Sequence, residues 1–100
     1  QSMNEPDLQA SIIRAEKARL LLDNDILSDA LDSMEREVVE LWGQAPTRDK
    51  EGKEELWRLF KTQQKFRMLL LGYIESGKYA QAQLAQYEKE SKLRSLFRAA

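Results

Sequence analysis

Residues that end helices are scarce in this sequence, and the clearest group of them spans residues 43–47. Gly43 suits the position that follows a helix, and Pro46 disfavours helical backbone in the residue before it. The whole sequence has only four glycines and two prolines, and 33% of its residues are charged. Such a composition is typical of long helices with few turns. We therefore predict an all-α fold with one firm turn.

Apolar residues recur on both sides of this turn in alternating steps of three and four. Before the turn, the first seam comprises Leu27, Leu31, Met34, Val38 and Leu41. After the turn, the second seam comprises Leu56, Leu59, Gln63, Phe66, Leu70 and Tyr73, and its phase continues through Gly77, Ala80, Leu84 and Tyr87. This spacing is the heptad pattern of helices that pack along a stripe. The two seams predict an antiparallel helical hairpin or small helix bundle.

Capping residues and breaks in the pattern divide the chain further. Asn4 or Asp7 can cap a first helix, and the apolar phase shifts at residues 23–25, which favour helix ends. Thr47 or Asp49 can cap the helix after the turn. Gly77 either ends that helix or lies within a longer one, and we favour an end there. The predicted helices are about 7–22, 25–43, 49–76 and 78–95, within a single domain over residues 3–100.

The two halves of the chain carry opposite charge. Residues 1–47 contain four basic and ten acidic side chains, a net charge of minus six. Residues 48–100 contain twelve basic and seven acidic side chains, a net charge of plus five. This asymmetry favours an acidic arm beside a basic arm, although one exposed ion pair contributes only about 0 to 1 kcal/mol.

The segment from Met68 to Leu71 points apolar groups almost all the way round its helix. Trp57, Met68 and Leu71 fall on a face beside the second seam, and a helix that is apolar on several sides is expected to be buried on several sides. A chain of one hundred residues also buries too little surface to be generously stable alone. We predict a homo-oligomer, a protein partner or both. The alternative is that the first helix covers this face within one chain.

Two tryptophans flank the turn at similar distances along the sequence. In a hairpin, Trp42 and Trp57 could approach each other near the closed end. We interpret them as packing residues that hold the turn.

Catalytic chemistry has few candidate residues. The sequence contains no cysteine and no histidine, which removes thiolate chemistry, the common general base near neutral pH and the commonest transition-metal ligand. Glu35, Glu37 and Glu40 are similar to the metal-binding glutamates of all-α nucleotide pyrophosphohydrolases. Such a site needs facing carboxylates, but the middle of the facing helix offers Lys61 and Lys65. We interpret the glutamates as a solvated face and predict no catalytic residue, no cofactor and no metal.

The basic C-terminal segment has three interpretations. Its cations are candidate nucleic-acid contacts, namely Lys89, Lys92, Arg94 and Arg98. Glu88 and Glu90 interrupt them, so nucleic-acid binding is not favoured. Its apolar residues form an i, i+3, i+4 patch that suits a helix lying in a groove of a partner, namely Leu93, Leu96 and Phe97. The third interpretation is a frayed terminus.

Residues 20–85 resemble small helical proteins encoded among the head and DNA-packaging genes of tailed bacteriophages and prophages. The resemblance is carried by residues 21–27, Ala30-Leu31, Glu35, Trp42, Pro46-Thr-Arg-Asp49, Glu51-Gly52 and Leu56-Trp57. It implies a role in the virion or its assembly, through contacts with other phage proteins, either in the cytoplasm of a bacterial host or in the virion. It implies no catalytic or binding residues.

The sequence shows no targeting signal or membrane span. We interpret Gln1-Ser2 as residues of cloning origin ahead of a natural start at Met3. No apolar run approaches the roughly 18 residues that a spanning helix needs. We therefore expect no membrane partner.

Overall fold

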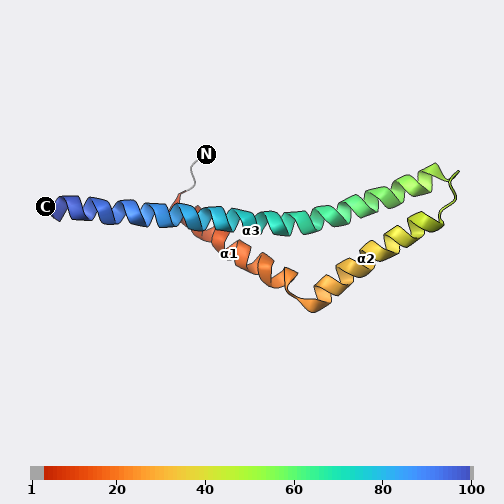
Figure 1. Ribbon diagram of the computed structural model, residues 1–100, viewed down its shortest axis with the longest axis horizontal. Coiled ribbons are helices and arrows are strands. Elements are labelled where there is room, and N and C mark those ends of the chain that lie inside the picture. Colours follow the sequence, from red (N-terminus) through yellow and green to blue (C-terminus); the bar gives the residue numbers. More distant parts are fainter. Residues whose placement is uncertain (1–3, 100) are drawn as a thin grey trace. The chain divides into compact units, whose positions relative to one another are not determined.

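The computed structural model describes residues 4–99, which form three α-helices and no strand (Figure 1). Helix α1 spans Glu5–Leu22, α2 spans Asp25–Gln44 and α3 spans Lys50–Ala99. The predicted all-α class is confirmed. The predicted start at Met3 lies outside the described residues. Within the described part of the chain, none of the helices is both long enough and apolar enough to cross a membrane.

The break between α1 and α2 lies at Asp23 and Asn24, where the apolar phase shifts. The Asn24 side chain accepts a hydrogen bond from the Leu27 N–H at 2.9 Å, and its backbone is extended. This is the geometry of a helix N-cap, which satisfies a backbone donor that has no partner in the first turn. Asn4 caps α1 in the same way, by accepting from the Asp7 N–H at 3.0 Å.

The turn between α2 and α3 covers Ala45 to Asp49. The Ala45 N–H closes α2 on the carbonyl of Leu41 at 3.0 Å. The Asp49 carboxylate then accepts from the Gly52 N–H at 3.0 Å and so caps α3. A Cβ at Gly52 would overlap that carboxylate as it is placed, and a small rotation of the Asp49 side chain would relieve the overlap.

Helix α3 continues through Gly77, so the predicted division into helices 49–76 and 78–95 is not found. Gly77 is buried, and a Cβ placed on it would overlap the Cβ of Ala15 in α1 and lie 3.4 Å from the Ser11 carbonyl oxygen. The glycine therefore permits a close approach of two helices. Its low helix propensity, about 1 kcal/mol worse than alanine, is offset by packing.

The chain forms two compact units. The terminal unit comprises Gln1–Arg19 and Leu71–Ala100. In it, Leu8 and Ala80 are 1% and 0% exposed, and the Arg14 guanidinium lies 4.7 Å from the centre of the Tyr73 ring. Small residues at the contact bring α1 close to α3.

The hairpin unit comprises Leu20–Leu70. Its contacts pair α2 with the first part of α3 in opposite directions, since Trp42 lies beside Trp57 near the turn and Asp32 binds Arg67 farther from it. Figure 1 shows α2 passing through the turn into α3. Next to the second contact, the buried Gln63 side chain donates to the Leu31 carbonyl oxygen at 2.6 Å.

The hairpin covers only part of each predicted seam. Leu31, Gln63 and Leu70 are buried, whereas four other members face solvent: Met34, Leu41, Leu59 and Phe66. Phe60 and Arg67, which are not seam members, are partly buried instead. Each helix is therefore rotated about its axis relative to the predicted packing.

Candidate interaction surfaces

Three aromatic side chains lie together at the closed end of the hairpin unit. The Trp42 and Trp57 rings lie 6.4 Å apart at 56°, and the Trp57 and Phe60 rings stack at 5.8 Å and 21°. The predicted approach of the two tryptophans is confirmed. These geometries are favourable for aromatic pairs, and the tryptophan pair holds α2 and α3 together next to the turn.

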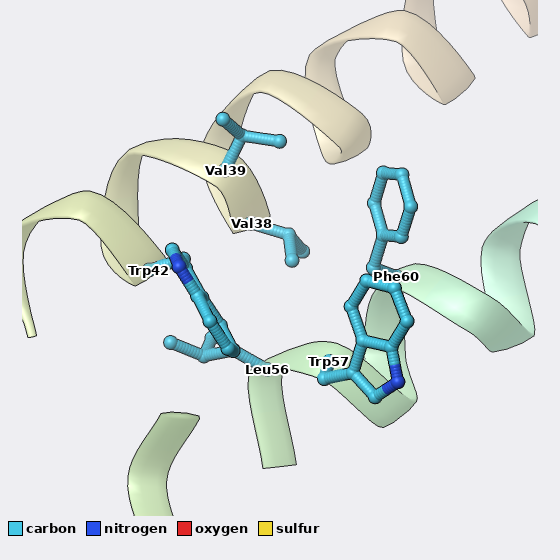
Figure 2. A pocket seen from close by; sticks show the side chains of 6 residues that line it. All are labelled: Val38, Val39, Trp42, Leu56, Trp57 and Phe60. Carbon is cyan, nitrogen blue, oxygen red and sulfur yellow. The ribbon is translucent and has the colours of Figure 1, made fainter. Parts of the chain in front are cut away.

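These rings and their aliphatic neighbours line a groove of about 260 Å³ that is open to solvent. The lining, seen in Figure 2, consists of Val38, Val39, Trp42, Leu56, Trp57 and Phe60. Trp42 and Trp57 remain 40% and 49% exposed although they touch each other. Half-exposed tryptophans in a groove are typical of surfaces that bind protein. We call this surface the aromatic groove.

Two lysines lie over the tryptophan faces. The Lys53 ammonium is 5.0 Å from the Trp42 ring centre, and the Lys61 ammonium is 4.8 Å from the Trp57 ring centre. Cation–π contacts at exposed sites contribute about 0.5 to 1 kcal/mol. The two lysines make the α3 rim of the groove basic.

The α2 side of the hairpin unit is acidic. A shallow depression there is lined by Asp29, Asp32, Glu35, Arg36, Val39 and Glu40. The Asp32 carboxylate also forms an ion pair with the Arg67 guanidinium, with Oδ1 and Nη2 2.6 Å apart, and this pair joins α2 to α3. Within residues 4–99, no group of three or more carboxylates is close enough to hold a metal ion. The surface therefore offers charge but no metal-binding geometry.

Two polar side chains lie inside the hairpin contact. Gln63 is 6% exposed, and its Oε1 is buried without a hydrogen-bond partner in the described chain. The Nε of Arg67 is also buried without a hydrogen-bond partner in the described chain, although the Nη2 of the same side chain donates to Asp32. Buried polar atoms without partners are costly. These two atoms therefore reduce the stabilisation that the contact between α2 and α3 provides.

The four exposed seam residues form a second apolar surface, the exposed stripe. Met34 and Leu41 lie seven residues apart on α2, as Leu59 and Phe66 do on α3, and their exposed fractions are 53%, 46%, 57% and 44%. Equal heptad spacing keeps each pair on one face of its helix. The stripe is thus a regular apolar surface that the hairpin does not cover.

The residues predicted from sequence as an interface are all exposed. Met68 is 68% exposed and Leu71 is 52% exposed. Met68 lies in a shallow depression with Lys61, Gln64, Lys65 and Leu69. Leu70, between them, is 7% exposed, so the chain covers one side of the segment from Met68 to Leu71, which we call the apolar girdle, and leaves the other sides open. Their part in an interface stays a prediction.

The C-terminal segment of α3, residues 85–98, is exposed at every position. We call it the tail. Leu96 and Phe97 are 68% and 79% exposed, and Leu93 is 45% exposed. At about 100° per residue, these three share one face of the helix. The spacing gives an amphipathic helix whose apolar face has no covering within the described chain.

The basic residues of the tail do not share one face. Lys89 lies on the same face as Leu93 and Leu96, and Lys92 borders that face, whereas Arg94 and Arg98 are offset by about 140° to 180° from Lys89. A helix that tracks phosphates needs cations along one face. The tail is instead an apolar face with basic borders.

Only part of the aromatic groove is predicted from the sequence. The two tryptophans predict its centre, but the heptad seams place neither Val39 nor Phe60 at this surface, because neither residue belongs to a seam. The tryptophan pair was the available signal: Val39 and Phe60 each lie three residues from one of the two rings. Comparison of this chain with models of protein families, with curated proteins and with solved structures found no match.

Proposed function

We propose that this chain is a non-enzymatic interaction protein that acts by packing its helices against copies of itself or against another protein. The observation that carries the proposal is the imbalance between buried and exposed apolar residues. Among the described residues, nineteen large hydrophobic side chains are exposed, whereas the buried hydrophobic ones number five. Scattered apolar residues are normal on a surface, but contiguous stripes and grooves mark sites of association.

Three separate surfaces support this proposal. They are the aromatic groove, the exposed stripe and the apolar face of the tail. Each is built on a helix, where side chains keep fixed spacing, and each suits another helix as its partner. The resemblance to small helical proteins of tailed-phage head and packaging genes agrees with an assembly role and directs the search for a partner to virion proteins.

Sedimentation equilibrium on the intact chain tests the proposal. We expect the average mass to exceed the 11.6 kDa of one chain and to rise with concentration, because association follows mass action. A strictly monomeric chain at tens of micromolar that also binds no candidate partner contradicts the proposal. Met68→Asp tests the apolar girdle. If Met68 lies in an interface, the substitution shifts the average mass toward that of the monomer. If Met68 touches no partner, the average mass is unchanged.

The second candidate function is nucleic-acid binding by the basic part of α3. The exposure of Lys89, Lys92, Arg94 and Arg98 favours it, and their distribution around the helix weakens it. Titration of mixed-sequence DNA at low and high salt measures it, since phosphate contacts make affinity fall steeply with salt. Absence of binding at low salt removes this candidate.

A further inference from the structure

We infer that the exposed stripe of the hairpin unit packs on the same stripe of a second copy, so that two hairpins form a four-helix bundle. This inference rests on the proposed function and names its partner. Met34, Leu41, Leu59 and Phe66 are about half exposed, and they continue the heptad pattern of the buried seam residues. Apolar residues at these positions belong to the core of a bundle.

The four residues of the stripe lie on one side of the hairpin. Met34 follows Leu31 by three residues and precedes Val38 by four, and the other members hold the same position in their seams. This spacing turns each exposed side chain roughly 60° away from the packed one. Because the two helices run in opposite directions, the same offset turns both sets toward the same side.

This rotation is the one that a four-helix bundle requires. In such a bundle each helix has two adjacent neighbours, and its apolar stripe points between them. In the hairpin unit, the buried half of each seam faces the other helix, and the exposed half faces out of the hairpin. A second hairpin laid on the stripe supplies the missing neighbour of α2 and of α3 at once.

Charge selects between the two symmetric ways of stacking the hairpins. Either α2 lies on α3 of the second copy, or like helices lie on each other. Helix α2 has six acidic residues and one basic residue, a net charge of minus five. Residues 50–70 have six basic and three acidic residues, a net charge of plus three. Opposite charges favour the arrangement with α2 on α3, with its two-fold axis parallel to the helices.

The residues beside the stripe favour the same arrangement. The register of the hairpin is fixed by two contacts, Trp42 with Trp57 and Asp32 with Arg67. Glu37 lies midway between the two contact residues of α2, and Thr62 lies midway between those of α3. With α2 on α3, Glu37 faces Thr62 of the second copy. With like helices together and the two-fold axis at the level of these residues, two copies of Glu37 face each other, which like charge disfavours.

Disulfide trapping on the intact chain tests this arrangement, and the natural sequence contains no cysteine to interfere. Chains with Glu37→Cys are mixed with chains with Thr62→Cys, allowed to exchange and oxidised. Both positions are exposed, and the Thr62 hydroxyl donates only to its own helix, at the Arg58 carbonyl oxygen. We expect a cross-linked heterodimer from the mixture and none from either variant alone, since a disulfide needs its Cβ atoms about 4 Å apart.

The matched control is Lys61→Cys, one residue from Thr62 and about 100° round the helix. Mixed with Glu37→Cys chains, it is expected to give no cross-link. A cross-link formed by Glu37→Cys alone overturns the inference in favour of like helices together. If the unmodified chain sediments as an oligomer but the Glu37→Cys and Thr62→Cys mixture stays uncross-linked, the inference is overturned and the proposed function stands. If the unmodified chain sediments as a monomer, there is no second copy to pack on the stripe. That result overturns both the inference and self-association.

Discussion

Gly72 and Gly77 lie five residues apart in α3, and their surroundings differ. A Cβ on Gly72 would meet no atom within 4 Å, whereas one on Gly77 would overlap the Ala15 side chain. We expect Gly72→Ala to stabilise the chain by about 0.5 to 1 kcal/mol through helix propensity. We expect Gly77→Ala to destabilise it by roughly 1 to 3 kcal/mol through overpacking. Urea unfolding followed by circular dichroism measures both.

The pair of variants separates packing from propensity because both substitutions are the same chemical change in the same helix. Equal stabilisation by both would show that α1 does not pack closely on α3 at Gly77. The sequence alone predicts the low helix propensity of Gly77. It could not predict the contact with Ala15, because that contact joins residues sixty-two positions apart.

At the scale of the helices, the sequence predicts the starts of α2 and α3 well because capping is local. Asn24 and Asp49 each accept a hydrogen bond from an N–H three residues later. The heptad pattern likewise predicts that Leu31, Gln63 and Leu70 are buried. It could not predict the rotation that exposes Met34 and Phe66, since the pattern records which residues are apolar and not which neighbour covers them.

The tail is the part of α3 that is least stabilised by packing, because all of its side chains from residue 85 to 98 are exposed. Isolated helices of about 12 to 15 residues are only marginally stable in water. We expect backbone amides in the tail to exchange hydrogen much faster than those near Ala80, which is 0% exposed. Hydrogen exchange with residue-level detection on the intact chain checks this.

The amides around Ala80 provide the internal control for that experiment, since they belong to the same helix. Equal protection in both regions would show that the tail is already docked on another chain. Slower exchange in the tail after a partner is added would identify the partner as a ligand of the tail.

At the scale of the whole chain, association and folding are expected to be linked. A tenfold rise in chain concentration adds about 1.4 kcal/mol to the stability of a dimer relative to its unfolded chains. We therefore expect Tm to rise with concentration in thermal scans. Phe66→Asp is expected to remove this dependence, because it places a charge in the exposed stripe.

Ile13→Asp is the matched control, since Ile13 is exposed to a similar extent, 55%, and lies in the terminal unit. Its Tm is expected to keep the concentration dependence. A Tm that is constant from micromolar to hundreds of micromolar chain would contradict the link. The sequence alone supports this expectation only in part: it predicts excess apolar surface, but which surface stays uncovered depends on the packing of all three helices.

The aromatic contact at the closed end of the hairpin also determines what intrinsic tryptophan fluorescence measures in this chain. Trp42 and Trp57 are the two tryptophans in the sequence, and their rings lie 6.4 Å apart. Intrinsic emission excited near the indole absorption edge therefore arises from one end of the hairpin unit, while the terminal unit contributes none. The chain carries a built-in local probe, so emission and far-ultraviolet dichroism followed together distinguish opening of that end from loss of helix elsewhere.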